Sequence, residues 1–438
     1  MSGAFDKARL QSLSLVEAAG AIARGDITSE ALVRALIERI EERDGIVRAW
    51  ASFDPDLALG QARACDEGKV RGPLRGAPIG VKDVLNTCDY PTQMGSPIYE
   101  GWRSRNDASC VAMLRNAGAV VLGKTITCEF AGTHPYDTTN PLDAGRTPGG
   151  SSSGSAAAVA DFMAPLALGT QTGGSVLRPA SFCGLVGFKP TFGGYNREGL
   201  RFAAESIDTI GLISRSVEDA AYCDLVLRGQ APSPLKRLEM APRIGLCRTY
   251  MWELAQDETR ACVAKVVERI EAAGVKIEEF ELPSHFADLT IARAIINDVE
   301  RARSLAWEWR AHRDKLSASL QRTMQSGIEI SDADYRNALR QVAAARLEVD
   351  AILRRFDIVV APAVNGEAPV GLHYAGDPSF QALWTLLHVP SITLPAHRGP
   401  NRMPVGIQVV APAGQDANLL RAALWMQQIA SVRMEANA

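Results

Sequence analysis

The chain has 438 residues, with 47 Lys+Arg against 50 Asp+Glu and a formal net charge of −3. This balance argues against a nucleic-acid-binding surface, which usually appears as a basic excess. The composition, 47% hydrophobic and 22% charged, is that of a globular protein. No apolar run reaches the roughly 18 residues that a membrane span needs, and the N-terminus lacks the pattern of an export signal. We therefore expect a cytoplasmic protein with no membrane association.

The eight cysteines and six histidines are scattered along the sequence. No pair of cysteines has CxxC spacing and no histidines form an HExxH pattern, so we expect free thiols, no metal and no cofactor.

Two amphipathic helices are predicted between Ser14 and Arg43, and Thr28-Ser29 stand where the second helix needs its N-cap. Short β-branched runs then alternate with helical patterns, which indicates an α/β fold with a mainly parallel sheet. The remaining predicted elements, in chain order, are strands at residues 78–81 and 119–122 with a helix at 109–116 between them, strands at 243–247 and 275–280, helices at 258–273 and 332–353, and strands at 358–361 and 405–410.

One stretch departs from the average composition. From Thr147 to Pro190, 44 residues carry three charges (Asp161, Arg178 and Lys189) but eight glycines and six serines. Glycine lets two backbone segments approach closely and adopt unusual dihedral angles, so Gly-Gly-Ser turns can bring hydroxyl groups together. The serine-rich turn also leads into a predicted helix, whose N-terminal N–H groups suit a developing oxyanion.

Two motif matches in this half of the chain lack the structural context that their mechanisms require. Residues 118–125 satisfy the written P-loop pattern, but the variable positions Ala-Val-Val-Leu are themselves the strand that should precede the loop. Residues 150–154 satisfy the GxSxG elbow of α/β-hydrolases, but Pro148 disfavours the central strand that must lead into it.

Lys82 is the candidate base for a serine in this stretch. Strand alternation sends Val81 and Asp83 to one side of the strand and Lys82 to the other. Burial would lower the pKa of the Lys82 ammonium towards neutrality and so free its lone pair. The alternative is that Lys82 pairs with a carboxylate in the core.

At these residues the sequence resembles the amidase signature family, and the resemblance covers nearly the whole chain, most weakly between residues 230 and 350. The segments that carry it are Val81-Lys82-Asp83, the Gly/Ser block at 149–158, Thr172-Gly173-Gly174-Ser175, the run 182–190, and the outlying segments 118–125, 356–362 and 404–408. The resemblance implies a single large α/β domain over residues 1–438 with a central mixed sheet. Within it we expect N-terminal helices (1–60), a catalytic core (75–225), a variable region that supplies pocket walls (230–350) and the C-terminal part of the core (351–438).

The resemblance also implies catalytic roles. Ser175 corresponds to the nucleophile, Ser151 to a bridging serine that follows a cis peptide, and Lys82 to the general base. It implies a relay in which neutral Lys82 draws a proton from Ser151 and Ser151 draws one from Ser175. The family's oxyanion hole corresponds to the backbone N–H groups of Thr172, Gly173, Gly174 and Ser175.

Substrates differ among members of this family. Gln171 and Arg178 resemble the malonamidase branch, so Arg178 is expected to hold a substrate carboxylate or else to pair with an internal acidic residue. Gln171 and His134 are further candidates for the substrate pocket, while Ser153 and Ser155 are expected to hydrogen-bond neighbouring groups.

The expected function is therefore hydrolysis of a small amide to a carboxylic acid and ammonia, with the amide as partner, no nucleic acid and a homodimeric assembly. Three alternatives stay open: an A-type component of a tRNA-dependent amidotransferase, a hydrolase of ureido compounds, and a non-hydrolytic binding module.

Overall fold

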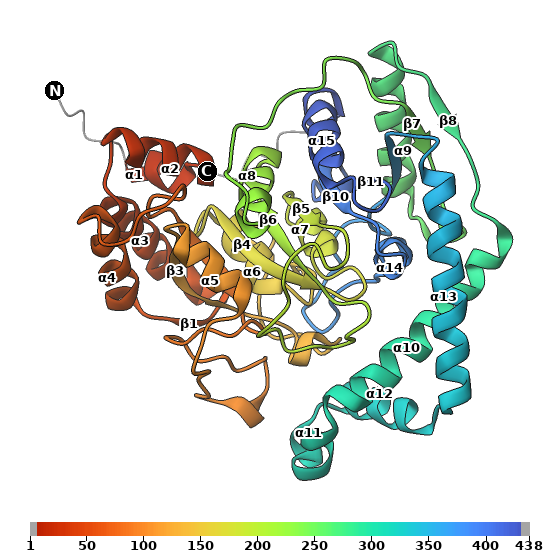
Figure 1. Cartoon of the computed structure of the whole chain (residues 1–438), viewed down its shortest axis with the longest axis horizontal. Coiled ribbons are helices and arrows are strands. Elements are labelled where there is room, and N and C mark those ends of the chain that lie inside the picture. Colours follow the sequence, from red (N-terminus) through yellow and green to blue (C-terminus); the bar gives the residue numbers. More distant parts are fainter. Residues whose placement is uncertain (1–6, 431–438) are drawn as a thin grey trace.

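The computed structural model describes residues 7–430, which form one α/β unit around an eleven-stranded sheet (Figure 1). The sheet order is β1-β3-β2-β4-β6-β5-β10-β11-β9-β7-β8. The strands are β1 (Trp50–Phe53), β2 (Pro78–Lys82), β3 (Val120–Thr125), β4 (Leu166–Gln171), β5 (Val186–Lys189), β6 (Thr209–Ser214), β7 (Ile244–Leu246), β8 (Ile277–Glu279), β9 (Ile358–Pro362), β10 (Ser391–Arg398) and β11 (Pro404–Val410).

The helices cover the sheet and extend beyond it on one side (Figure 1). They are α1 (Lys7–Ser12), α2 (Leu15–Arg24), α3 (Ser29–Val47), α4 (Pro55–Asp66), α5 (Ser109–Asn116), α6 (Ser153–Ala160), α7 (Leu177–Phe182), α8 (Val217–Leu227), α9 (Asp257–Ala272), α10 (Leu289–Ser304), α11 (Ala306–Ala311), α12 (Ala318–Glu329), α13 (Asp332–Leu353), α14 (Ser379–Leu386) and α15 (Asp416–Ala430).

Local signals set several of these boundaries as expected. The Thr28 side chain accepts a hydrogen bond from the Ala31 N–H and begins α3, and the helix predicted at 109–116 is α5. The helix predicted at 332–353 is α13, which begins at the capping residue Ser331. The N-terminal half of the chain and the 230–350 region thus contain the predicted helices close to the predicted bounds.

The sheet is mixed, as the family resemblance implies, but its parallel part is smaller than the β-α-β rhythm indicates. Parallel pairing is confined to the blocks β3-β2-β4 and β9-β7-β8, while β6, β5, β10 and β11 pair antiparallel with their neighbours between these blocks. The strands β1, β4, β5, β6 and β10 were not among the predicted elements. Every antiparallel pair of named strands except β11 with β9 includes one of them.

The pairing of β2 with β4 positions the site. These strands run parallel, with Val81 opposite Leu168, so their carboxyl ends meet at one edge of the sheet. Lys82 ends β2, and Thr170 and Gln171 end β4. Side chains at the carboxyl ends of neighbouring parallel strands face a common crevice, which is where α/β proteins bind their ligands.

A group of helices, α10 to α13, extends from the sheet as an arm at the lower right of Figure 1. The arm shares an apolar cluster with the main body, in which Ile296 of α10 and Val342 of α13 are buried together with Val359 of β9 and Trp384 of α14. Because α10 also packs against α14, the arm contacts the main body near the crevice.

No helix in the described part of the chain is both long enough and apolar enough to cross a membrane.

Candidate active site

The Lys82 side chain is fully buried, and its partners are hydroxyl and carbonyl groups rather than carboxylates. Its Nζ lies 2.9 Å from Ser151 Oγ, 2.7 Å from Thr170 Oγ1 and 3.4 Å from the Thr170 carbonyl oxygen. Among residues 7–430 no carboxylate forms an ion pair with it. Burial lowers the pKa of the Lys82 ammonium to about 7, so the amine is half neutral near physiological pH.

Two other buried lysines show that burial alone does not make a base. The Lys124 ammonium forms an ion pair with Asp83 at 3.1 Å. Pairing with a buried carboxylate is the alternative role that the sequence left open for Lys82. Lys189, whose pKa burial also lowers to about 7, donates to the carbonyl oxygens of Pro190 and Val389. Of the three, Lys82 is the one that donates to a serine hydroxyl.

The ion pair of Lys124 also bears on the P-loop pattern at 118–125. Lys124 lies inside β3, is fully buried and donates to the Thr92 hydroxyl at 2.7 Å. A lysine held in this way cannot reach a phosphate, so the pattern match is a strand and not a nucleotide site.

Ser151 lies between Lys82 and the pocket. The Gly150–Ser151 peptide bond is cis, as the family resemblance implies. The Cys128 N–H donates to the Ser151 carbonyl oxygen at 3.1 Å, and the Ser175 carbonyl oxygen accepts from the N–H of Ser152 at 3.3 Å. These contacts tie the two serine-bearing loops together, although the described hydrogen bonds include none between the Ser151 and Ser175 hydroxyls.

The loop from Thr172 to Ser175 presents unpaired backbone donors. Within the described region, no hydrogen bond engages the N–H groups of these four residues. Position 174 requires glycine because a Cβ there would lie 2.4 Å from Gln381 Oε1. The loop therefore combines a close backbone approach with several free N–H donors beside the Ser175 hydroxyl, which is the composition of an oxyanion hole.

Gln171 lies behind this loop rather than in the pocket. Its Oε1 accepts from the N–H groups of Val176 and Leu177 at 2.8 and 3.0 Å, and its Nε2 donates to Thr385 Oγ1 at 2.9 Å. Thr385 in turn donates to the Gly173 carbonyl oxygen at 2.6 Å. Because both ends of the Gln171 amide are engaged, the residue holds the loop and the start of α7 instead of contacting a substrate.

A buried carboxylate holds the other end of the loop. The Thr172 hydroxyl donates to Asp208, which also accepts the N–H groups of Ala203 and Ala204. Burial raises the pKa of the Asp208 carboxyl, and these donors oppose that shift. Sequence reasoning did not identify Asp208, since no motif surrounds it.

Arg178 is 6% exposed and lines the pocket from α7. One of its terminal nitrogens donates to the Gly150 carbonyl oxygen at 2.6 Å, while its Nε and its other terminal nitrogen have no partner in the described structure. Burial lowers the pKa of the Arg178 guanidinium to about 10. The internal ion pair that was the alternative for Arg178 is not formed among residues 7–430, so two donors remain for a ligand.

The pocket beside Ser175 has a volume of about 170 Å³. Its walls come from the 128–134 segment, the 172–178 loop, α10, α12 and Pro378. His134 lies in this wall, as expected, and its ring contacts Tyr136 edge to face. Because α10 and α12 belong to the 230–350 region, that region does contribute to the pocket.

Ser153 and Ser155 lie outside the pocket wall. The Ser153 hydroxyl donates to the Ile126 carbonyl oxygen at 3.4 Å, and the Ser155 hydroxyl donates to that of Leu168 at 2.9 Å. Ser155 Oγ also lies 2.7 Å from Thr125 Oγ1. Both serines thus fasten α6 to the strands below it.

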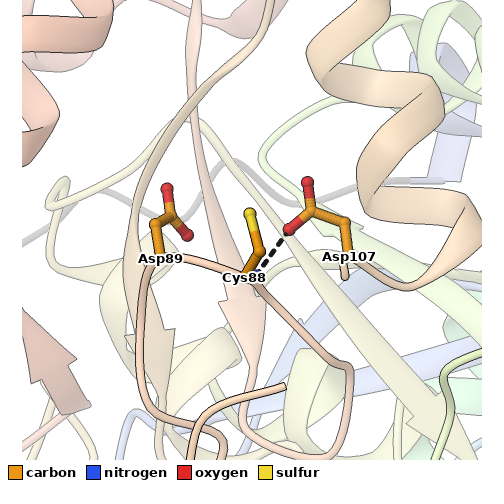
Figure 2. A group of neighbouring side chains, drawn as sticks. All are labelled: Cys88, Asp89 and Asp107. Atoms are coloured by element: carbon orange, nitrogen blue, oxygen red, sulfur yellow. Dashed lines mark hydrogen bonds between the residues drawn. The ribbon is translucent and has the colours of Figure 1, made fainter. Parts of the chain in front are cut away.

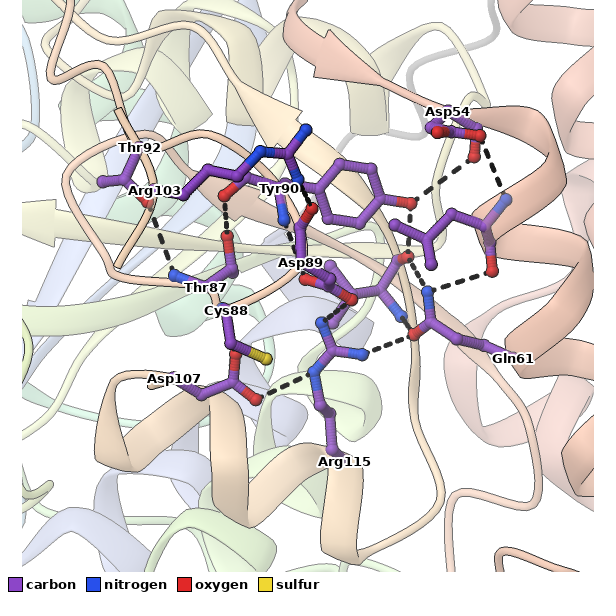
Figure 3. A network of polar contacts seen from close by, with 12 residues as sticks. Asp54, Gln61, Thr87, Cys88, Asp89, Tyr90, Thr92, Arg103, Asp107 and Arg115 are labelled. Atoms are coloured by element: carbon purple, nitrogen blue, oxygen red, sulfur yellow. Dashed lines mark hydrogen bonds and ion pairs between the residues drawn. The ribbon is translucent and has the colours of Figure 1, made fainter. Parts of the chain in front are cut away.

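Away from this pocket, the Cys88 thiol lies close to the carboxylates of Asp89 and Asp107 (Figure 2). The three groups resemble a metal-ligand set, but Arg115 forms ion pairs of 2.6 Å with Asp89 and 3.1 Å with Asp107. Arg115 also donates to Gln61 of α4, which makes the group part of a wider polar network (Figure 3). The guanidinium already supplies the positive charge at these carboxylates, so we assign no ion to them.

Comparison with known proteins identifies the class of enzyme that this fold and pocket define. A sequence model of the amidase family matches residues 31–420, and the chain belongs to that family. It is therefore an amidase, a hydrolase acting on C–N bonds.

Among individual proteins, the chain is similar to the A-type component of glutamyl-tRNA(Gln) amidotransferase from several bacteria. It is 34% identical to that of Thermobifida fusca, over 93% of each chain, and 34% identical to that of Oleidesulfovibrio alaskensis, over 96% of this chain and 98% of the relative. Among solved structures it is similar to an amidase (TM-score 0.87, 29% identity, 96% and 100% of the two chains) and to the peptide amidase of Stenotrophomonas maltophilia (TM-score 0.82, 26% identity, 97% and 98%).

These relatives correct the expected partners. We expected a homodimer whose partner is a small amide and which does not act with nucleic acid. The relatives are named as one component of an enzyme of glutamyl-tRNA. That expectation was wrong. Its nucleic-acid part rested on whole-chain charge and its homodimer part on the commonest assembly of soluble enzymes, and neither registers the complex in which a protein works.

Proposed function

We propose that the chain releases ammonia from a carboxylated amide through an acyl-enzyme formed on Ser175. The observation that carries this proposal is the position of Lys82: a fully buried amine without a carboxylate partner, 2.9 Å from the Ser151 hydroxyl, at the edge of the pocket that Ser175 lines. A neutral amine in this position accepts a proton, whereas a charged one would not.

In the first half of the reaction, the neutral Lys82 Nζ takes the Ser151 hydroxyl proton as Ser151 Oγ takes the proton of Ser175. The Ser175 oxygen attacks the amide carbon, and the resulting oxyanion accepts hydrogen bonds from the free N–H groups of the 172–175 loop. Ser151 then returns a proton to the amide nitrogen, and Lys82 reprotonates Ser151. The C–N bond breaks, leaving ammonia and an ester on Ser175.

In the second half, water takes the place of ammonia. Lys82 and Ser151 draw a proton from the water, whose oxygen attacks the ester carbon, and the same N–H groups hold the second oxyanion. Collapse of this intermediate returns the proton to Ser175 and releases the carboxylic acid.

Arg178 supports a carboxylate on the substrate. Arg178 lines the pocket three positions after Ser175 and has two unpartnered nitrogens, and a guanidinium donates strong charge-assisted hydrogen bonds to a carboxylate. The small cavity supports a short substrate, because about 170 Å³ is the liquid volume of only five or six water molecules.

We further propose, as a second candidate, that this amidase works as the A-type component of a glutamyl-tRNA amidotransferase, so that the ammonia passes to a partner instead of water. Similarity at 31–34% identity over nearly the full length of several such proteins supports this assembly. The eight free cysteines support a reducing cytoplasm as its location.

Ammonia release from a panel of amides tests the first proposal. The panel contains malonamate and succinamate (carboxylated), butyramide (neutral), glutamine (zwitterionic) and biuret (ureido). Ser175→Ala should abolish release from every amide, and Arg303→Gln, outside the pocket, serves as a folded control. Release that persists in Ser175→Ala would refute the acyl-enzyme, and a preference for biuret would favour a ureido hydrolase.

The assembly is tested by adding the remaining components of the amidotransferase from a relative, with glutamyl-tRNA and the best amide of the panel. We expect the tRNA-linked glutamate to become amidated and ammonia to be withheld from solution. Full ammonia release into solution with no amidated tRNA would instead favour a hydrolase that works alone, as in the malonamidase branch.

A further inference from the structure

The pocket is lined by more positively charged side chains than negatively charged ones. Three arginines line it, Arg178 on α7 and Arg293 and Arg301 on α10, against one carboxylate, Glu129. Arg293, Asn297 and Arg301 are spaced four residues apart, so they follow one another along a single face of α10. That face is turned towards the pocket, while Ile296 and Val299 bury the opposite side.

The positive charge of Arg301 is balanced by groups within the protein. Its guanidinium donates to the Phe130 carbonyl oxygen at 3.0 Å, and the buried carboxylates of Asp208 and Glu129 act on its charge. Glu129 itself accepts the Ser317 N–H. Arg301 is therefore part of the wall, and its charge has acidic neighbours.

Arg293 differs in having no hydrogen-bond partner. No hydrogen bond or ion pair of the described residues engages its guanidinium, which reaches to 3.9 Å from where a Cβ on Gly173 would lie. The carboxylates of Asp298 and Asp377 act on its charge from a distance, but both accept their hydrogen bonds from other groups. Asp298 accepts from the Ser326 hydroxyl and the Asn297 amide, and Asp377 accepts from Ser379 and Asn365.

We infer that Arg293 is a specificity-determining residue that, together with Arg178, binds the acidic end of the substrate and makes the pocket selective for amides of net negative charge. This deepens the proposed function and rests on it. The two guanidinium groups come from different elements and contribute free donors to one cavity, so a single carboxylate can be held between them. An ammonium group next to that carboxylate would be repelled by the same charges, so glutamine should be a poorer substrate than succinamate.

The test compares Arg293→Gln with Arg293→Lys and with Arg303→Gln, a control on the same helix. Arg303 is exposed, pairs with Asp332 at 3.7 Å and lies over the Tyr335 ring, away from this cavity. With succinamate, Arg293→Gln should raise KM roughly ten- to a hundred-fold and change kcat by less than about three-fold. Arg293→Lys should recover part of the loss, and Arg303→Gln should behave as the unmodified protein.

Butyramide, which lacks the carboxylate, separates substrate binding from structural damage. Its kcat/KM should be unchanged in Arg293→Gln. An equal loss on butyramide and succinamate would overturn the inference and make Arg293 a structural residue, and no loss on either would overturn it as well.

A binding measurement gives a readout that does not need turnover. Succinate titrated into Ser175→Ala should bind, and it should bind roughly ten- to a hundred-fold more weakly to Ser175→Ala with Arg293→Gln. Equal affinity in the two proteins would overturn the inference. If Ser175→Ala still releases ammonia, the proposed mechanism fails, whereas the succinate comparison still decides the role of Arg293.

Discussion

Three buried lysines in one protein separate the effect of burial from the effect of a partner. Burial lowers the pKa of Lys82, Lys124 and Lys189 alike. Asp83 opposes that shift at Lys124, and the Lys189 amine donates its hydrogen bonds to carbonyl oxygens. A lysine becomes a usable base where a lowered pKa coincides with a hydroxyl that must lose a proton, and this condition is met at Lys82.

The pH dependence of the reaction follows from this lysine. The pKa of Lys82 is lowered to about 7, so the neutral amine is the main form above that pH and the charged form below it. We expect kcat/KM to rise with pH through an apparent pKa near 7 and to fall about tenfold for each pH unit below it. The measurement is the pH profile of ammonia release at low substrate concentration.

Lys189→Met is the control for this profile, because it removes the other lysine whose pKa burial brings to about 7. The profile should keep its midpoint in this variant, and Lys82→Met should lack activity at every pH. A midpoint that moves with Lys189 would contradict the assignment of the base.

The same contrast shows what the sequence can predict at this scale. Lys82, Ser151 and Ser175 lie in motifs whose glycines and serines are local, so they could be proposed as catalytic residues from the sequence alone. Arg293 was missed because its role depends on a helix that comes more than 100 residues after Ser175. Its signal was a polar stripe at four-residue spacing, which is equally typical of a solvated helix face.

At the scale of single elements, the conformation of the loop between β4 and α7 depends on one side chain, that of Gln171. Gln171 satisfies the first N–H groups of the α7 turn and connects the loop to Thr385 of α14. Sequence reasoning placed Gln171 in the substrate pocket, since its partner Thr385 is 214 residues away and no local pattern reveals that contact.

Substitutions at Gln171 test this structural role. Gln171→Leu leaves two buried N–H groups unpaired and should lower the free energy of unfolding by about 2–6 kcal/mol, at about 1–3 kcal/mol for each donor. Gln171→Glu keeps the oxygen that accepts from both N–H groups, so it should retain more stability and a higher kcat than Gln171→Leu. Denaturant unfolding and ammonia release check both variants, and equal losses in the two would show that this acceptor is not what matters.

Over the whole molecule, two separate parts build one pocket. The sheet and its loops supply the serines, lysine and N–H donors, and the arm of α10 to α13 supplies Arg293 (Figure 1). The position of α12 within the arm depends on a close contact with α10, where Gly327 of α12 meets the α10 backbone. A Cβ at Gly327 would lie 2.0 Å from the Asp298 carbonyl oxygen.

Gly327→Ala should therefore force α12 away from α10 and shift the pocket wall without touching the serines. We expect kcat/KM for succinamate to fall about tenfold and the free energy of unfolding to fall by about 1–3 kcal/mol. Gly45→Ala in α3, where no atom lies within 4 Å of the new methyl group, is the matched control and should not lose stability. Wild-type kinetics in Gly327→Ala would show that the arm position does not affect the pocket.

The order of the strands was the part of the fold least accessible from sequence. The β-α-β rhythm predicted parallel pairing, and it holds where helices connect neighbouring strands, as at β2 and β3. It fails in the middle of the sheet, where β6 pairs antiparallel with both β4 and β5, and where β10 and β11 return from the C-terminal part of the chain and insert between β5 and β9. Pairing between such distant segments leaves no signal in a local pattern.

This late insertion has a consequence for how the protein is made. All of the proposed acid–base and nucleophilic groups have been synthesised once residue 175 is added, yet β5 and β9 have no strand between them until residues 391–410 follow. A chain without these residues would carry the proposed catalytic serines on an open sheet with two exposed edges, a state prone to aggregation. Amide cleavage should begin only after β10 and β11 have been synthesised and have paired, so a late segment of the polypeptide controls the chemistry of an earlier one.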